Sequence, residues 1–191
     1  MPLDLRRAKG WAGQLVEAAL GAPGGSRPEP DFSHLGVELK TLPVDARGQP
    51  RESTWVCTAP MDATMDRRWE ESRVRHKLAH VLWVPIVGDR ADGPGERILG
   101  APSYWEPSAA EEDVLRADWE ELSEALGRGE LRMLHGRVGK ALQLRPKAAR
   151  GDDLVWALDD EANWVQTVPL GFYLRARFTR GLLARHTRAS A

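Results

Sequence analysis

The sequence lacks the features that stabilise disulfide-bonded proteins or anchor membrane proteins. Its single cysteine, Cys57, excludes a disulfide framework within the chain. No apolar run approaches the roughly 18 residues that a membrane-spanning helix needs, and the longest, residues 81–87, has the length of a strand. Residues 1–7 do not have the apolar core of a signal peptide. We therefore expect a soluble cytoplasmic protein that does not enter a membrane.

Two kinds of binding motif are also missing from the sequence. The five histidines and Cys57 have no zinc-like spacing, so we predict none of them as a metal ligand. No glycine-rich phosphate-binding loop ending in Gly-Lys-Ser or Gly-Lys-Thr occurs, so any dependence on ATP must come from a partner. The 191 residues have an ordinary globular composition and fit one domain, or one domain split into two lobes.

Acidic residues are absent from two basic segments. Residues 171–191 contain five arginines, and residues 137–151 contain three arginines and two lysines. Residues 106–130 instead contain nine acids and only two arginines, so the net charge of −1 hides a strong asymmetry. Clustered basic segments can follow the phosphates of a nucleic acid. The alternative is that each charged run is simply a solvated face.

Hydrophobic periodicity predicts an α/β domain with a central mixed sheet flanked by helices. The predicted helices are residues 9–20, 109–126 and 178–187, of which the second has a Ser108/Glu111 capping box and acids on its outer face. The predicted strands are 35–42, 53–58, 79–87 and 141–145, with a short edge strand at 98–100 and a turn or strand at 171–174. We expect 53–58 to form a hairpin with 35–42. Residues 61–76 are polar, and 152–163 are ambiguous.

Pro30-Asp31 followed by Glu38-Leu39-Lys40 is the candidate catalytic motif. Side chains alternate along a strand, so Glu38 and Lys40 share one face while Leu39 points into the core. Carboxylate and carbonyl oxygens can hold a hard cation against a phosphodiester, and an ammonium can stabilise charge that develops during cleavage. We predict Asp31, Glu38 and the Leu39 carbonyl as metal ligands, and Lys40 as the catalytic ammonium. The same spacing also fits the solvated face of an edge strand.

Ordered blocks along nearly the whole chain resemble the MutH family of mismatch-repair endonucleases, which has the restriction-endonuclease-like fold marked by PD…(D/E)xK. The blocks are 9–11, 20–22, 26–29, 31–32, 35–41, 43–45, 72–78, 81–83, 118–122, 144–149, 171–174 and 182–186. So many blocks in order are far more specific than the catalytic motif. The resemblance implies one monomeric endonuclease domain, residues 1–191, with two arms around a DNA cleft. We expect a catalytic lobe at about 1–90 and a DNA-reading lobe at about 91–191.

The resemblance also assigns the catalytic residues. It implies Mg2+ at Asp31 and Glu38 and makes Lys40 the motif lysine. It implies that Lys77 is a second lysine important for cleavage. Glu17, on the predicted helix at 9–20, matches a glutamate near the metal site.

The family nicks the unmethylated strand of hemimethylated GATC sites, on the 5′ side of the guanine. The implied DNA-reading residues are Lys9, Trp55, Arg145, Pro146, Lys147 and Tyr173. Arg145 suits a guanine edge and Lys147 a guanine or a phosphate, while Tyr173 matches the tyrosine that senses the adenine N6 position. The alternatives are ordinary phosphate contacts for Arg145 and Lys147, and ordinary core positions for Tyr173 and Trp55.

Three functions are compatible with these observations. The first is a Mg2+-dependent nickase of methyl-directed mismatch repair, stimulated by MutL after MutS has found a mismatch with the use of ATP. The second is a GATC-specific type II restriction endonuclease that cuts both strands. The third is a non-catalytic DNA-binding module of the same fold. A single catalytic motif favours the first function over the second, and the complete set of site residues disfavours the third.

Overall fold

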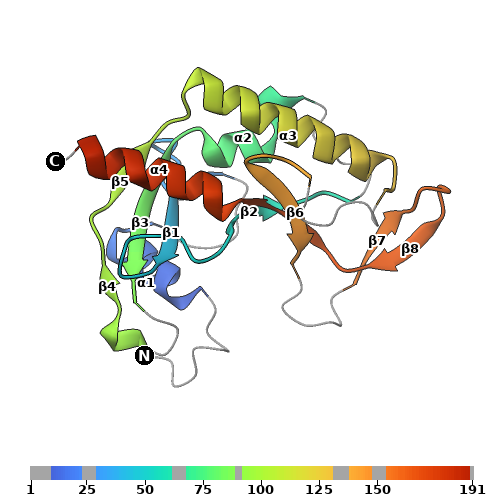
Figure 1. The fold of residues 1–191 in the computed structure, drawn as a ribbon. Helices are drawn as coiled ribbons and strands as arrows, with labels where there is room; N and C mark the ends of the chain where they lie inside the picture. The colour runs from blue at the N-terminus through green and yellow to red at the C-terminus, as the bar shows by residue number, and fades with distance from the viewer. Residues whose placement is uncertain are drawn as a thin grey trace. The chain divides into compact units, whose positions relative to one another are not determined.

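A computed structural model of the chain describes residues 10–22, 29–61, 68–88, 92–130, 138–147 and 154–189. These residues form a mixed α/β protein, as predicted, with α-helices at Trp11–Ala19 (α1), Arg73–Leu78 (α2), Ala109–Gly127 (α3) and Ala176–Ala189 (α4) (Figure 1). The short helix α2 was not predicted, because charged residues dominate segment 61–76, although Val74 within it is buried. Among the described helices, none is long and apolar enough to cross a membrane.

The chain divides into two compact units that are interleaved in sequence. Unit 1 contains Met1–Glu52, Lys77–Glu106 and Thr179–Ala191, and unit 2 contains Ser53–His76 and Pro107–Phe178. The units therefore do not coincide with the expected lobes at about 1–90 and 91–191. The reason is strand pairing, because the segment at 54–58 pairs with a strand more than 100 residues further along the chain.

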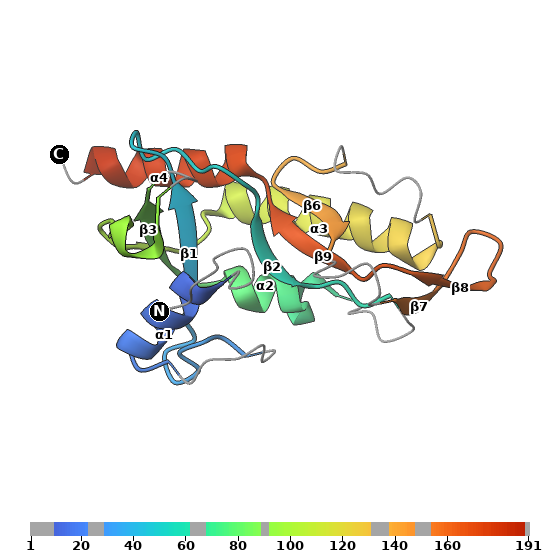
Figure 2. The same cartoon turned by 90° about the horizontal axis from the view of Figure 1, so that it is seen from below.

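Unit 1 contains the mixed sheet that the sequence predicts. Its strands are Glu38–Val44 (β1), Val81–Val87 (β3), Ile98–Leu99 (β4) and Ser103–Trp105 (β5). β1 pairs with β3 in parallel, and β3 pairs with β4 and β5 in antiparallel fashion. A parallel pair needs a long crossover connection, which here includes segment 53–76 of unit 2. Figure 2 shows β1 and β3 side by side.

Helix α1 packs against β1 and so lies beside the predicted catalytic motif. Val16 of the helix joins Leu39 and Val84 in a buried cluster, against which Phe32 and Leu82 are partly buried. Gly13 allows the close approach, because a Cβ atom there would lie 3.2 Å from Thr41 Oγ1. The helix ends before Gly21, whose φ of 75° favours glycine, as the sequence predicts.

Unit 2 contains an antiparallel sheet in the order β2-β9-β6, formed by Thr54–Thr58 (β2), Leu170–Leu174 (β9) and Leu142–Pro146 (β6). The predicted hairpin between segments 35–42 and 53–58 is therefore wrong. The apolar residues of β2 instead lie with those of β9 and α3, since Cys57, Phe172, Trp119 and Leu126 line one small pocket. The ambiguous segment 152–163 contains strand Val155–Leu158 (β7), which forms a hairpin with Trp164–Thr167 (β8).

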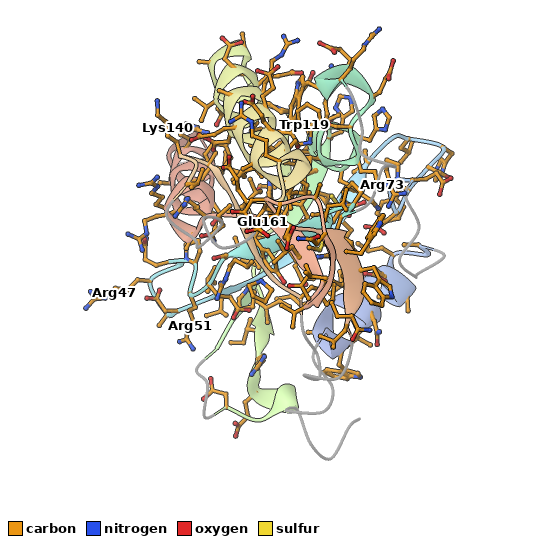
Figure 3. All side chains as sticks on the ribbon, turned by 90° about the vertical axis from the view of Figure 1, so that its right-hand side faces the viewer. Arg47, Arg51, Arg73, Trp119, Lys140 and Glu161 are labelled. Carbon is orange, nitrogen blue, oxygen red and sulfur yellow. The ribbon has the colours of Figure 1, made fainter. Side chains whose placement is uncertain are left out.

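Helix α3 begins at the predicted capping box, in which Ser108 and Glu111 each accept a hydrogen bond from the other's backbone N–H. Its apolar residues Leu115, Trp119, Leu122 and Leu126 are buried as predicted. The expectation that its acids lie outside fails at Asp118, which is 4% exposed. The backbone N–H groups of Lys140, Ala141 and Leu142 donate to the Asp118 carboxylate at 2.5–2.8 Å. The helix thus fixes the start of β6 (Figure 3 labels Trp119 on the helix, and Lys140).

Candidate functional site

In unit 1, the carboxylate of Glu38 lies between two lysine side chains. Lys40 Nζ donates to Glu38 Oε1 at 2.5 Å, and Lys77 Nζ donates to Glu38 Oε2 at 2.8 Å. Lys77 Nζ also donates to the carbonyl oxygen of Glu29 at 2.6 Å. The contact between Glu38 and Lys40 confirms that both lie on the same face of β1. Lys77 comes from the end of α2, just before the parallel partner strand β3.

This ion cluster is buried, which excludes the solvated face that the spacing alone left open. Glu38 is 3% exposed, Lys77 6% and Lys40 7%. Two ammonium groups share one carboxylate, so the cluster carries a net positive charge when all three are ionised. Burying charged groups is costly unless they are paired. Such a cluster is therefore poorly suited to a purely structural role and well suited to binding an anion such as a phosphate.

A tight turn brings Asp31 back to the same end of β1. Asp31 Oδ2 accepts a hydrogen bond from the backbone N–H of Leu39 at 2.9 Å. The turn closes through an isolated bridge between Phe32 and Val37, and Gly36 adopts a φ of 67° within it. The side chain of Leu39 packs in the core with Val16 and Val84, as expected, while its backbone N–H contacts Asp31.

Glu17, on α1, is the third carboxylate at this end of β1. Burial raises its pKa above the ordinary value of 4.5, and the negative charges of Asp31 and Glu38 raise the pKa further. Lys40 and Lys77 act in the opposite direction. All five residues predicted for catalysis therefore interact electrostatically within unit 1, although their positions in the sequence span 60 residues.

The oxygen donors here fit a hard divalent cation in their chemistry, because such ions prefer carboxylate and carbonyl oxygens. Among the described residues, no three His, Cys, Asp or Glu side chains are already grouped as a metal centre. Both carboxylate oxygens of Glu38 instead contact lysines. A cation that binds Glu38 would use the remaining lone-pair sites of these oxygens or replace one of the lysine contacts. Asp31 and Glu38, with the carbonyl of Leu39, are the residues that would hold it.

In unit 2, four of the predicted DNA-reading residues share one face of the β2-β9-β6 sheet: Trp55, Arg145, Lys147 and Tyr173. Trp55 and Gln143 both pair with Tyr173, and Arg145 pairs with Gly171 two residues before it. Residues paired in this way have side chains on the same face. Gly171 leaves room there, because a Cβ atom would lie 3.2 Å from Trp55 Nε1 and 3.3 Å from the Tyr173 ring.

The two cations of this face lie over its aromatic rings. Arg145 Cζ is 5.8 Å from the centre of the Tyr173 ring, and Lys147 Nζ is 4.9 Å from the centre of the Trp55 ring. Both rings are half-buried, so neither is an ordinary core residue. Pro146, between Arg145 and Lys147 in the chain, is exposed. It pairs with Leu170 at the end of β6. Lys9 lies outside the described residues.

Comparison with known proteins bears on both units. A family model described as DNA mismatch repair enzyme MutH matches residues 20–118. The chain is also 49% identical to the DNA mismatch repair protein MutH of Serratia proteamaculans, and 48% identical to the proteins of that name from Yersinia enterocolitica and Yersinia pestis. Each of these likenesses covers 97% of this chain and 82% of the relative. The chain belongs to the MutH family of DNA mismatch repair enzymes.

Membership of the MutH family confirms the resemblance read from the sequence blocks. The segment matched by the family model contains Asp31, Glu38, Lys40 and Lys77. The identity to MutH relatives extends over 186 residues and thus over both units, including the strands of the β2-β9-β6 sheet. The chain is therefore a DNA mismatch repair enzyme of MutH type, which implies a nuclease.

Sequence reasoning missed several residues that contact the predicted site residues. The hydroxyls of Ser53 and Thr58 hold Arg145 and Lys147, and Gln143 contacts Ser53. Their only signal in the sequence is Gln143, a polar residue between Leu142 and Leu144 in a strand pattern. Such a position predicts a polar side chain on the face away from the core, so the sequence indicates neither the burial of Gln143 nor its partner.

Proposed function

We propose that this protein is a Mg2+-dependent endonuclease that nicks the unmethylated strand at hemimethylated GATC sites during methyl-directed mismatch repair. The observation that carries the proposal is the buried Glu38 between Lys40 and Lys77, beside Asp31. A carboxylate pair with two ammonium groups supplies both the ligands for a cation and the positive charge for a phosphate. Membership of a family of mismatch repair enzymes supports the choice of DNA as substrate.

The catalytic residues divide the work of phosphodiester hydrolysis. Asp31 and Glu38 would hold Mg2+ with the carbonyl of Leu39, and the bound ion neutralises phosphate charge and stabilises the leaving oxyanion. Lys40 would orient the attacking water and stabilise negative charge on the phosphate. Lys77 stays anchored to the Glu29 carbonyl and holds the other side of Glu38. Glu17, whose pKa is raised by burial and by the charges of Asp31 and Glu38, adds a third carboxylate beside the motif.

Base reading is the role of the β2-β9-β6 face. Arg145 has the donor geometry for the O6 and N7 atoms of guanine, and Lys147 provides a point charge for guanine or phosphate. The half-buried ring of Tyr173 beside them is suited to pack against the adenine N6 position, where a methyl group and a hydrogen differ in volume. Trp55, Pro146 and Lys9 complete the proposed DNA-reading set.

The wider setting is part of the same proposal. It includes activation by MutL after MutS has found a mismatch, with ATP used by those partners. It also includes a monomer in the cytoplasm and a restriction-endonuclease-like fold with two arms around DNA.

Four duplexes test the proposal: unmethylated, hemimethylated and fully methylated GATC DNA, and DNA without the site. Each is incubated with the purified protein, with and without Mg2+, and the products are separated on a denaturing gel. We expect Mg2+-dependent nicking of the first two duplexes, weak for the protein alone and stronger with MutL and ATP. Equal cleavage of DNA lacking GATC would refute the specificity. Cleavage of both strands of the hemimethylated duplex without MutL would instead identify a restriction endonuclease.

Variants separate catalysis from binding in the same assay. Glu38→Ala should abolish nicking while DNA binding is largely kept, because the binding face lies on other residues. Lys40→Ala should lower the rate by about 100-fold or more, as loss of a group that stabilises transition-state charge does elsewhere. Nicking by Glu38→Ala at the wild-type rate would remove Glu38 from the site and favour a catalytic centre elsewhere.

A further inference from the structure

The hydroxyl of Ser53, which Gln143 also contacts, holds the guanidinium of Arg145. Gln143 and Arg145 lie on one face of β6, because they are two residues apart in a strand. The hydroxyl oxygen of Ser53, the residue directly before β2, accepts a hydrogen bond from Gln143 Nε2 at 2.6 Å. The same oxygen accepts one from Arg145 Nη1 at 3.2 Å. A continuous set of contacts therefore leads from the sheet interior to the exposed guanidinium.

Gln143 fixes the position of Ser53. Its side chain is 7% exposed, and a buried amide needs hydrogen-bond partners. A hydroxyl oxygen has two acceptor sites, so Ser53 can serve Gln143 and Arg145 at once. Ser53 is thus held from the interior and presents its second acceptor site to the exposed Arg145.

Arg145 is held on a second side by the ring of Tyr173, 5.8 Å from its Cζ atom. This distance lies within the range of about 6 Å over which a cation is attracted to an aromatic face. An arginine held in place before binding loses less conformational freedom when it binds. Ser53 occupies one of the five N–H donors of the guanidinium, so donors remain for a bidentate contact with a guanine edge.

Lys147 shows the same arrangement at the other end of β2. Its Nζ atom donates to Thr58 Oγ1 at 2.8 Å and lies 4.9 Å from the centre of the Trp55 ring. A lysine ammonium is a point charge with freely rotating donors, whereas the guanidinium is a rigid planar fork. A hydroxyl contact can therefore set the direction of the donors for Arg145 but not for Lys147.

We propose that Ser53, itself held by Gln143, is a positioning residue that determines specificity by orienting the donor fork of Arg145 toward a guanine edge. This inference rests on the proposed function, in which Arg145 reads the guanine of the GATC site. It adds that discrimination depends on a hydroxyl that does not itself contact DNA. Thr58, which holds Lys147, contributes affinity without discrimination.

The test uses a GATC duplex and the same duplex with 7-deazaguanine in place of the guanine, which removes the N7 acceptor. Nicking is measured as kcat/KM with Mg2+. For the wild type we expect a loss of about 10-fold on the modified duplex, within the range for one base contact. Ser53→Ala should already be about 10-fold slower on normal GATC and should respond less than about threefold to the modification. Ser53→Thr, which keeps the hydroxyl, should behave like the wild type.

Two further variants distinguish positioning from general damage. Gln143→Leu should match Ser53→Ala, and the double variant should lose no more than either one, because both act through the same contact. Thr58→Val should slow both duplexes equally and keep the wild-type ratio. Melting temperatures of all variants should stay within a few degrees of the wild type.

The outcomes separate this inference from the proposed function. A wild-type enzyme that does not prefer GATC overturns both. A wild-type enzyme that prefers GATC but ignores 7-deazaguanine, or a Ser53→Ala variant with the full wild-type response, overturns the role of Ser53 alone. Failure of Ser53→Thr to restore the response likewise overturns it.

Discussion

Replacing Glu38 by alanine removes a carboxylate that contacts both Lys40 and Lys77. Both ammonium groups then lose this counter-charge while remaining 6–7% exposed. Breaking a buried ion pair by removing one partner typically costs about 3–5 kcal/mol, because a charge stays buried without compensation. That is a large part of the roughly 5–15 kcal/mol that stabilises a typical domain. We therefore expect Glu38→Ala to lower the free energy of unfolding by about 3–5 kcal/mol.

Urea denaturation with EDTA present measures this loss without a contribution from bound metal. Glu124→Ala is the matched control, because Glu124 also pairs with a cation, Arg128, but both side chains are 62% exposed. An exposed pair of this kind contributes only about 0–1 kcal/mol. A second change, Lys77→Met, made in the Glu38→Ala background should recover part of the stability, since it removes one uncompensated charge. A loss at Glu38 no larger than at Glu124 would refute the buried cluster.

Three other predictions concern single residues. Tyr173→Ala should reduce discrimination between methylated and hemimethylated GATC more than it slows cutting of unmethylated DNA, and an unchanged preference would remove Tyr173 from methyl sensing. Asp118→Asn should lower the free energy of unfolding by about 1.5–3 kcal/mol, because hydrogen bonds to a charged acceptor are lost. Urea denaturation measures this effect. The control is Glu120→Gln, which changes an exposed acid of the same helix. Glu17 has a raised pKa, so its folded form holds the proton more tightly than the unfolded chain does, and its ionisation costs stability as pH rises through that pKa. Glu17→Gln should therefore be more stable than the wild type at neutral pH in EDTA. The difference in stability should vanish below about pH 4, where the glutamate is protonated in both the folded and the unfolded chain. A difference that persists in acid would show that the ionisation of Glu17 is not its cause.

Local patterns in the sequence predicted most of the elements. The capping box at Ser108 and the apolar spacing behind it gave the start and buried face of α3, and the glycine at position 21 marked the end of α1. These signals act over a few residues, because helix caps and side-chain periodicity depend on neighbouring positions. Helix α2 gave only a weak signal, since it is six residues long and has just two apolar residues at helical spacing, Val74 and Leu78.

Pairing between distant segments was where sequence reasoning failed. Nothing near 53–58 indicates that its partner is 170–174 rather than the adjacent strand 38–44. Helical spacing places Asp118 on the same face as Leu115 and Leu122, but it does not show that the carboxylate binds three backbone N–H groups. In both cases the partners are distant in sequence and become neighbours only when the apolar surfaces pack.

The sequence by itself determined the family of this protein and the identity of its candidate catalytic residues. Ordered blocks and the Asp31, Glu38 and Lys40 spacing are properties of the chain alone. Only the tertiary structure decided that these residues are buried and that Lys77, 39 positions beyond Glu38, closes on its second oxygen. It also decided that Ser53 and Gln143 hold Arg145. The physical reason is that burial and long-range hydrogen bonds depend on which surfaces pack together, and no spacing along the chain encodes that directly.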